Sequence, residues 1–380
     1  MAGIYIHIPF CKQKCHYCNF FSLASVRNKA TFLDALKHEM ASRAGYLNGE
    51  TVNTVYFGGG TPSLLSAAEV SGLIAALKQH FQVDPAVEIT LEANPDDLST
   101  GYLSELTGTE VNRLSIGVQS FFDDDLTYLN RAHNAAEAIS ALSRAQAAGF
   151  SNLTMDLIYG IPTLTDEKWL ANIGRFLNTG INHLSAYALT VEHKTALHLL
   201  ISKGRAAAVD EQQSARHFEM LMNTLQQHGF IHYEISNFAR PGYYSRHNSI
   251  YWLGGHYVGL GPSAHSFNGH SRQWNVSNLT AYIAHTESQQ QLYEHEQLSV
   301  EQQYNEYVMT SLRTSWGCDT EHILNVFGVV YRDYCLAQSK KHISSGHLFC
   351  DQHRLFLTDK GKLFADGIAA DMFRDQDESH

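Results

Sequence analysis

Short apolar runs rich in β-branched and aromatic residues alternate with longer amphipathic stretches through the first 235 residues. The runs have the length of buried strands, and we predict strands at 4–8, 54–57, 88–92, 113–117, 153–158, 183–189 and 231–235. Between them, apolar residues recur at helical spacing, which predicts helices at 31–46, 67–81, 135–148 and 210–228. Strands that alternate with helices are typical of βα units around a parallel sheet. The pattern therefore predicts an α/β fold whose six or seven units form an incomplete barrel.

The rest of the chain has two further patterns. Residues 236–297 are rich in glycine, histidine and aromatic residues without a clear period, so we expect an irregular connecting segment across the barrel mouth. A small α+β domain is predicted at 298–380, with helices at 301–313, 321–327 and 331–342, a hairpin of 347–350 with 354–357, and a last helix capped by Thr358. We therefore divide the chain into residues 1–235, 236–297 and 298–380.

The charge of the chain limits its partners. It has 380 residues, with 27 Lys and Arg against 38 Asp and Glu, for a formal net charge of −11. No stretch gathers the basic residues that DNA or an anionic membrane attracts, so we expect no nucleic-acid partner. No uncharged apolar run reaches the roughly 18–20 residues that span a bilayer, and the first residues lack a secretion signal. We therefore expect a cytoplasmic protein without a membrane span.

Three of the six cysteines, Cys11, Cys15 and Cys18, lie close together directly after the first predicted strand. Thiolates on one short loop can converge on a [4Fe-4S] cluster, because soft sulfur ligands suit iron. Three ligands leave one iron open, and an open metal position can bind a substrate or cofactor. Two alternatives remain at this point: a zinc site completed by His7 or His16, and a thioredoxin-like redox pair of Cys15 and Cys18.

The loop HIPFCKQKCHYCNF resembles the cluster loop of the radical S-adenosylmethionine (SAM) enzymes. Further blocks follow in the order typical of the branch that contains the oxygen-independent coproporphyrinogen III oxidases and the HemW-type heme chaperones. They are FGGGTPSLL (57–65), EITLEANP (88–95), NRLSIGVQSF (112–121), DLIYGIP (156–162), YEISNFA (233–239) and HNSIYW (247–252). The resemblance covers residues 4–312 and implies a partial radical SAM barrel. It also implies that the three cysteines bind a [4Fe-4S] cluster and that SAM chelates its fourth iron.

Two of these blocks suit a ligand site on physical grounds as well. Gly58, Gly59 and Gly60 follow a predicted strand, where glycine lets the backbone approach a ligand closely. Glu92 ends another strand, where a carboxylate can accept hydrogen bonds from an amine or from ribose hydroxyls. Alone, these features would equally indicate a turn and a solvated acid. The resemblance assigns SAM contacts to Tyr5, Tyr17, Gly59, Gly60, Thr61, Glu92, Gln119, Arg131, Asp156 and Ala188.

The two kinds of protein in this branch differ at positions that the sequence reveals. The oxidases carry a fourth cysteine two positions after the third, where this chain has Phe20. The chaperones carry an H-N-x-x-Y-W element, and the resemblance assigns heme binding to the matching His247, Asn248, Tyr251 and Trp252. A neutral imidazole is a common axial ligand of heme iron, and flat aromatic side chains can pack on a porphyrin. Without the resemblance, a hydrogen-bonded histidine and ordinary core packing would be the simpler interpretation.

The favoured hypothesis is therefore a heme chaperone that binds the cluster, SAM and heme and delivers heme to apo-proteins such as respiratory cytochromes. The alternative is an oxygen-independent coproporphyrinogen III oxidase of heme biosynthesis, so the sequence leaves open whether the chain is catalytic. The resemblance also implies an electron donor such as flavodoxin or ferredoxin, and a monomer or homodimer.

Two other groups of residues are candidates for metal or heme contacts. The spacing in a cysteine- and histidine-rich stretch matches no common zinc finger, so we favour structural roles over a zinc site. Its members are Cys335, His342, His347, Cys350 and His353. Near the heme element, further residues could supply a second axial ligand or pair with heme propionates. They are His256, His265, His270, Arg240 and Arg246.

Overall fold

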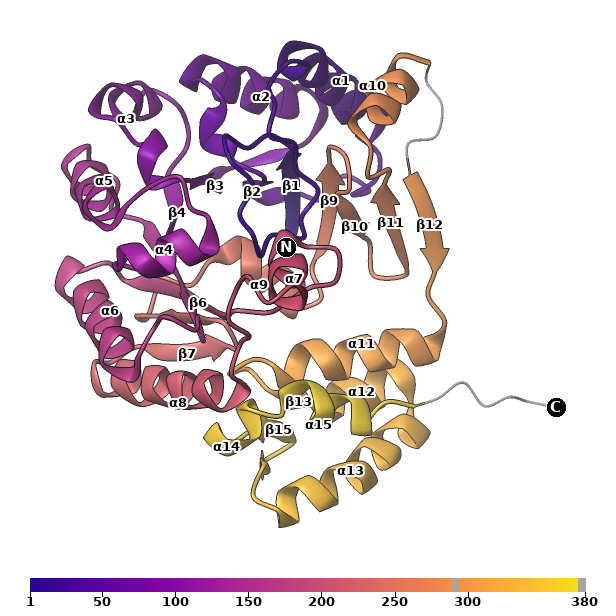
Figure 1. Ribbon diagram of the computed structural model, residues 1–380. Coiled ribbons are helices and arrows are strands. Elements are labelled where there is room, and N and C mark those ends of the chain that lie inside the picture. Colours follow the sequence, from indigo (N-terminus) through magenta and orange to yellow (C-terminus); the bar gives the residue numbers. More distant parts are fainter. Residues whose placement is uncertain (289–292, 375–380) are drawn as a thin grey trace.

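The computed structural model describes residues 1–288 and 293–374, which form a curved sheet with helices on its outer side and a smaller C-terminal unit (Figure 1). The described strands of the large sheet follow the order β12-β11-β10-β9-β1-β2-β3-β4-β5-β6-β8-β7. Six consecutive strands are parallel: β1 (Ala2–Ile8), β2 (Val52–Gly59), β3 (Val83–Ala93), β4 (Arg113–Gln119), β5 (Leu153–Tyr159) and β6 (His183–Ala188). The predicted α/β fold and its incomplete barrel are thereby confirmed.

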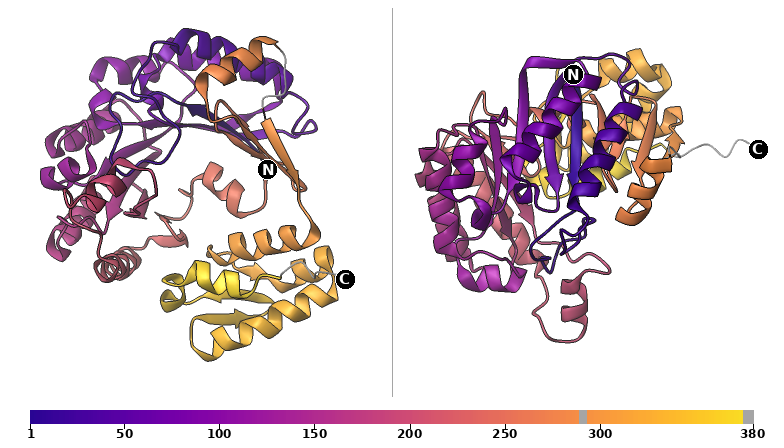
Figure 2. Two further views of the ribbon diagram at one scale, coloured as in Figure 1. Left: turned by 45° about the vertical axis from the view of Figure 1, so that its right-hand side comes forward. Right: turned by 90° about the horizontal axis from the view of Figure 1, so that it is seen from above.

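Helices connect these strands along the outside of the curve (Figure 2). They are α1 (Lys29–Ser42), α2 (Ala67–His80), α3 (Thr100–Leu106), α5 (Ala135–Ala147), α6 (Asp166–Thr179) and α8 (Glu211–Gln227), with 3-10 turns at Pro62–Leu64 and Pro95–Asp97. Capping boxes at Ser66 and Asn134 explain where α2 and α5 begin. The short helices α4 (Asp123–Leu129) and α7 (Ala196–Ser202) instead form backbone hydrogen bonds with the loop after β1.

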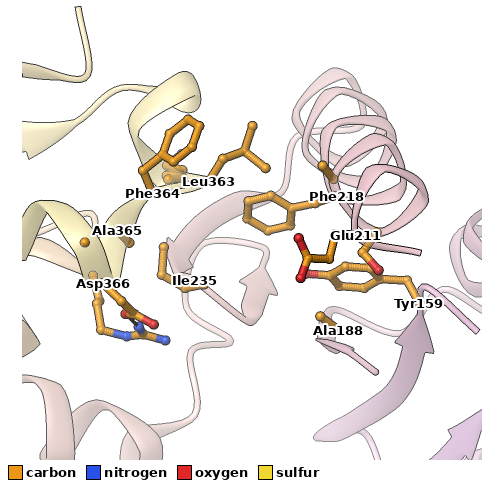
Figure 3. A pocket seen from close by; sticks show the side chains of 14 residues that line it. Tyr159, Ala188, Glu211, Phe218, Ile235, Leu363, Phe364, Ala365 and Asp366 are labelled. Atoms are coloured by element: carbon orange, nitrogen blue, oxygen red, sulfur yellow. Dashed lines mark hydrogen bonds and ion pairs between the residues drawn. The ribbon is translucent and has the colours of Figure 1, made fainter. Parts of the chain in front are cut away.

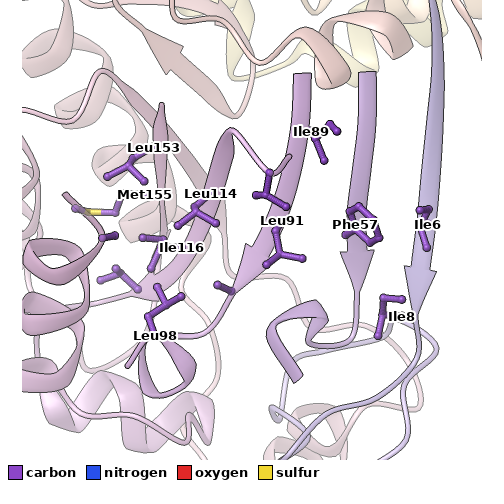
Figure 4. Packing of buried hydrophobic residues seen from close by; sticks show 14 of the residues in the cluster. Ile6, Ile8, Phe57, Ile89, Leu91, Leu98, Leu114, Ile116, Leu153 and Met155 are labelled. Carbon is purple, nitrogen blue, oxygen red and sulfur yellow. The ribbon is translucent and has the colours of Figure 1, made fainter. Parts of the chain in front are cut away.

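Alternate residues of a strand point to opposite faces of the sheet, and this decides what lies inside the curve. Ile6, Phe57, Leu91 and Ile116 face the helices and are fully buried in one continuous apolar core (Figure 4). Burial of each such side chain contributes about 1.5–3 kcal/mol. The residues between them face the concave side, which therefore carries tyrosine, histidine, serine and carboxylate side chains.

Residues 236–297, which we expected to be irregular, contain regular elements that widen the sheet. At one edge, β9 (His256–Leu260) pairs parallel to β1, and β10 (His265–Phe267), β11 (Ser271–Asn275) and β12 (Tyr293–Gln297) follow in antiparallel pairs. At the other edge, β8 (Asn237–Ala239) joins β6 to β7 (Ile231–Glu234), again antiparallel, so 231–235 is not a further parallel strand. Strands of only 3 to 5 residues are too short to show a period in the sequence.

Two helices belong to the same segment. The helix α10 (Leu279–Ser288) packs on α1 at the outer side of the sheet. The helix α9 (Arg246–Trp252) lies on the concave side, where it contacts β1, β2 and β9 as well as α11 of the C-terminal unit (Figure 2). Its partners Thr54, Ala86 and Glu88 belong to the amino-terminal halves of β2 and β3, so α9 does not lie across the barrel mouth at their carboxyl ends, where this segment was expected.

The C-terminal unit packs around a second core that includes Tyr304, Val308 and Leu355. The helices α11 (Val300–Leu312), α12 (Thr320–Phe327) and α13 (Val329–Ser344) match the predicted ones. The predicted hairpin is formed by β14 (Leu348–Asp351) and β15 (Arg354–Leu357), which β13 (Cys318–Asp319) extends, and α14 (Asp359–Lys362) and α15 (Ala365–Asp371) follow the Thr358 cap. This separate core supports a domain boundary near residue 298, which stays a proposal. No helix in the described ranges has the length and apolarity needed to cross a bilayer.

Candidate functional site

The loop between β1 and α1 is fixed at both ends, and this determines where its three cysteines lie. The Cys11 amide donates a hydrogen bond to the Leu23 carbonyl at 3.0 Å, and the Leu23 amide donates to the Pro9 carbonyl at 2.7 Å. Further along, the His16 amide donates to the Leu129 carbonyl at the end of α4, at 3.1 Å. The loop is therefore held at the carboxyl ends of the strands, where parallel α/β proteins place their functional residues.

The three thiols of this loop influence one another. Cys11 is buried, Cys15 and Cys18 are partly exposed, and all three are free. Burial raises the pKa of Cys11 and of Cys18, and the neighbouring thiols raise it as well. A guanidinium nitrogen of Arg131 donates a hydrogen bond to the Cys15 sulfur at 3.3 Å. The three sulfur atoms are thus close enough to interact electrostatically, beside a fixed positive charge.

This donor set fits a [4Fe-4S] cluster better than a single metal ion. In the ranges that the structure describes, no three His, Cys, Asp or Glu side chains gather closely enough to hold one ion. The cysteine ligands of a [4Fe-4S] cluster need not gather so closely, because each binds a different iron atom. The histidines of the zinc alternative use a ring nitrogen on other partners: His7 on the Phe21 carbonyl at 2.8 Å and His16 on the Tyr128 carbonyl at 3.2 Å.

The glycine run at the end of β2 packs directly against the cysteine loop. The Gly60 amide donates to the Ile8 carbonyl at 2.8 Å, and a Cβ atom at Gly60 would lie 2.6 Å from the Phe10 carbonyl oxygen. Gly59 has a φ of +106°, and a Cβ atom there would lie 2.6 Å from the His7 ring. A side chain fits at neither position without a shift of its neighbours. The glycines therefore let the end of β2 approach the cysteine loop, which the sequence had suggested only for a ligand.

Arg131 connects the cysteine loop to the ends of β3 and β4. Besides its contact with Cys15, it donates to the Asn94 side-chain oxygen at 2.6 Å and to the Gly117 carbonyl at 3.0 Å. The Asn94 amide group donates in turn to the Thr61 hydroxyl at 3.3 Å. We did not predict Asn94 from the sequence, although it directly follows the strand whose end suggested a functional carboxylate. Arg131 and Asn94 together thus link the ends of β2, β3 and β4 to the proposed cluster loop.

Two carboxylates, Glu92 and Asp156, lie on the concave side of the sheet. The Tyr56 hydroxyl donates to Glu92 at 2.8 Å, and the Ser115 hydroxyl donates to Asp156 at 3.1 Å. Burial raises the pKa of both carboxyl groups to about 7. A positively charged ligand offsets the cost of ionising a buried carboxyl group, so this region favours a cation. The ammonium and sulfonium groups of SAM have that charge.

We expect SAM binding to strengthen as the pH rises through 7, because Glu92 becomes ionised above its pKa. Calorimetric titration with SAM from about pH 6 to about pH 8.5 should show this rise, and Glu92→Gln should make it shallower, because only Asp156 still titrates there, and should weaken binding about 10-fold at the upper end. Without SAM the raised pKa has the opposite effect on stability. The free energy of unfolding should fall as the pH rises from 4.5 to about 7, because the buried Glu92 carboxyl must then ionise. The exposed Glu105→Gln is the matched control, and an unchanged profile in Glu92→Gln would refute this role.

The other residues of the predicted SAM set lie at different depths. Tyr5 is inside the barrel, where its ring stacks on Tyr56 with centroids 6.1 Å apart. Gln119 ends β4 with a φ of +66°, a costly conformation for a residue other than glycine that often occurs at functional sites. Tyr17 lies on the cysteine loop, and Ala188 ends β6, where it lines a cavity next to the C-terminal unit. The predicted SAM residues therefore extend from the cysteine loop after β1 to the end of β6, the last of the six parallel strands.

His247 of the predicted heme element lies inside the barrel. It is 1% exposed, its Nδ1 is 2.8 Å from the Thr54 hydroxyl, and its Nε2 is 2.8 Å from the Tyr251 hydroxyl. Its ring stacks on Tyr56 with centroids 4.9 Å apart. Burial lowers the pKa of His247 to about 3, so the imidazole is neutral at physiological pH. A neutral imidazole can bind heme iron, but one of these hydrogen bonds would first have to break.

The rest of this element reaches outward from the barrel interior. Asn248 and Trp252 are partly exposed, and the Asn248 amide donates to the Ser245 hydroxyl that caps α9, at 3.3 Å. The Arg313 guanidinium carbon lies 5.4 Å from the centre of the Trp252 ring. The helix therefore connects the barrel interior to the C-terminal unit.

The remaining candidates are not brought together. Several of those near the heme element have other partners: His256 with Glu50, His265 with Trp274, Arg240 with Phe230 and Arg246 with Ala86. In the cysteine- and histidine-rich stretch, Cys335 is buried in the second core while Cys350 is exposed on β14. No group of three potential metal ligands occurs among the described residues there.

Comparison with known proteins agrees with this geometry. Residues 5–174 match the family model of the radical SAM superfamily, and residues 298–364 match that of the HemN C-terminal domain. The barrel, the cysteine loop and these matches define a radical SAM protein. Heme chaperone HemW of Mycobacterium tuberculosis (strain ATCC 25618 / H37Rv) is 34% identical over 371 residues, which are 96% of this chain and 93% of that protein. For heme chaperone HemW of Bacillus subtilis (strain 168), the identity is 33% over 97% of this chain and 98% of that protein.

The chain belongs to the HemW family of heme chaperones. A solved structure shares its fold as well: coproporphyrinogen III oxidase (HemN) from Escherichia coli superimposes with a TM-score of 0.84 over 98% of this chain and 90% of that chain. The sequence identity to that oxidase is 24%, so this likeness concerns the fold alone.

Proposed function

We propose that this protein binds heme and transfers it to acceptor proteins, and that it carries a [4Fe-4S] cluster and SAM at the barrel mouth. The observation that carries the proposal is its similarity, over nearly the whole chain, to proteins named heme chaperones. Phe20 supports it, because it occupies the position of a fourth cysteine in the oxidases that the loop also resembles. Phe20 is 64% exposed, and its phenyl ring cannot bind a metal.

In this proposal Cys11, Cys15 and Cys18 hold the cluster. Arg131 offsets part of the negative charge of the thiolates, since it donates to Cys15. The hydrogen bonds of the loop keep the sulfur atoms in place, and Cys11 itself is buried. With SAM bound, such a cluster supplies one-electron radical chemistry.

We assign SAM to the concave side of the barrel next to this loop. Glu92 and Asp156 would hold its cationic or hydroxyl groups, because both are buried carboxyls with a raised pKa. Thr61 lies between the glycine run and Asn94, within reach of the cysteine loop. Further contacts are proposed for the remaining residues of the set, namely Tyr5, Tyr17, Gly59, Gly60, Gln119, Arg131 and Ala188.

Heme is assigned to the region of α9, through His247, Asn248, Tyr251 and Trp252. Ligation of the iron by His247 would require the loss of its hydrogen bond to Thr54 or to Tyr251. An iron–histidine bond would therefore couple heme binding to a rearrangement of these side chains. We further propose acceptor proteins such as respiratory cytochromes, an electron donor such as flavodoxin or ferredoxin, and a monomer or homodimer.

One sample tests the chaperone against the oxidase. After anaerobic cluster reconstitution, titration with hemin should saturate at about one heme per chain with a shifted Soret band. The same sample, supplied with SAM, a reductant and coproporphyrinogen III, should form no vinyl-bearing product. Hemin binding without turnover supports the chaperone, whereas turnover of coproporphyrinogen III would favour the oxidase and overturn the proposal.

A further inference from the structure

A cavity lies between the barrel and the C-terminal unit, and it adjoins the proposed SAM site through Ala188. Its volume is about 490 Å³, within the range of roughly 300–1,000 Å³ that is typical of small-molecule sites. Tyr159 and Phe218 contribute to its wall from the barrel, and Leu363 and Phe364 contribute from the C-terminal unit (Figure 3). Flat apolar rings thus come from both sides, which suits a planar ligand.

Two cations line the same cavity, and both are held by carboxylates that solvent reaches. Arg313 pairs with Asp366, and the Lys362 ammonium lies 2.9 Å from an Asp359 oxygen. The side chains of these two aspartates are 69% and 62% exposed. The side chains of Arg313 and Lys362 are only 17% and 22% exposed, but each aspartate can turn toward solvent, so the carboxylates of a ligand can take its place beside the cation. Glu211 lines the cavity on the barrel side, so a carboxylate faces the cavity there and the two cations lie nearer the C-terminal unit.

Two polar atoms of the wall are buried without a hydrogen-bond partner among the described residues. They are Nε of Arg313 and the hydroxyl of Ser214. A buried donor without a partner is costly and indicates that a partner is missing. The guanidinium of Arg313 also lies against the Trp252 ring at 5.4 Å. The cavity and the last residue of α9 therefore share one side chain.

Building on the proposed heme function, we propose that the tetrapyrrole, a flat apolar ring with two carboxylates, docks first in this cavity, beside α9 and before any bond to His247 forms. Arg313 and Lys362 bind the carboxylates, and the aromatic walls contact the ring. Trp252 positions Arg313, which gives the heme element a role at this site. Because both ring nitrogens of His247 are engaged inside the barrel, docking in the cavity requires no iron–histidine bond. Metal-free protoporphyrin IX therefore binds as hemin does.

The test is a titration of the full reconstituted chain with hemin and, separately, with protoporphyrin IX. Arg313→Gln and Phe364→Ala should each weaken the binding of both ligands about 10-fold. Asp366→Asn should tighten it, because it removes the carboxylate that competes for Arg313. A gain in affinity cannot result from misfolding, so this variant keeps the test valid even where Arg313→Gln is destabilised. Val330→Ala, at an exposed apolar residue of the same unit that does not line the cavity, should bind as the wild type does.

The outcomes separate this site from the proposed function. If His247→Ala loses hemin binding while Arg313→Gln, Asp366→Asn and Phe364→Ala keep the wild-type affinity, the cavity is not the docking site, although heme binding stands. Failure of protoporphyrin IX to bind where hemin binds would also overturn the cavity site. A wild-type chain that binds neither tetrapyrrole would refute the proposed function itself.

Discussion

Serine in place of Cys11, Cys15 and Cys18 together should abolish iron–sulfur binding, whereas the same change at Cys350 should leave it intact. After anaerobic reconstitution we expect about four iron and about four sulfide per wild-type chain, and none in the triple variant. The reason is chemical, because a serine hydroxyl is a poor ligand for iron compared with a soft thiolate. Iron and sulfide analysis together with visible absorption measures the effect.

Cys350 is a suitable control because it is an exposed thiol on β14, outside the loop. Cys318 and Cys335 are less suitable, since both are buried in the second core and their loss would disturb packing. If the triple variant retains the iron, sulfide and absorption of the wild type, the cluster is bound elsewhere and the assignment of the loop is wrong.

The second large effect concerns Gly60, where we expect alanine to reduce SAM affinity by at least about 100-fold. The added Cβ atom would lie 2.6 Å from the Phe10 carbonyl oxygen and 2.8 Å from that of Ile8. Both contacts are with backbone, so the end of β2 must move away from the cysteine loop. Thermal unfolding should also show a loss of about 2–4 kcal/mol, since the strain falls on buried backbone. Calorimetry with SAM measures the loss of binding.

Gly72→Ala provides the matched control. Gly72 lies in α2, and a Cβ atom there would meet no other atom within 4 Å. Alanine at an open helical position stabilises a protein by about 0.5–1 kcal/mol, and SAM binding should not change. If Gly60→Ala binds SAM as Gly72→Ala does, the approach of β2 to the cysteine loop has no part in the SAM site.

The central architecture could be predicted because its signals are local. Buried parallel strands appear as short apolar runs, and those of β1 to β6 are separated by helices of clear period. The C-terminal unit was equally accessible, since Thr358 is a good N-cap and β14 and β15 are joined by a short turn. The cysteine loop could also be predicted, because its three cysteines are close together in the sequence.

The sheet edges were hidden because their partners are distant in sequence. In β9, His256 pairs with Ala2 of β1, and no property of either segment alone indicates this pairing. The strands of residues 236–297 also have only 3 to 5 residues, so they are too short to show the alternation that would reveal them. Short sequence windows could only indicate an irregular segment there.

Parts of the site were hidden for a different reason. The concave face of the barrel is lined by polar side chains, so an inward residue looks like a residue of an exposed loop. His247 is almost fully buried, yet its neighbours in sequence give no sign of it. Asn94 and Ser115 act through contacts with Arg131 and Asp156, which lie on other strands or loops. Only the assembled sheet brings these partners together.

Electron paramagnetic resonance of the reduced, reconstituted protein, recorded with and without SAM, tests most directly whether one iron is left open for this ligand. A [4Fe-4S] cluster held by three cysteines should give a signal whose g-values shift when SAM binds, because SAM coordinates the iron that lacks a thiolate. A cluster signal that saturating SAM leaves unchanged, or the absence of any cluster signal in the wild-type chain, would contradict it.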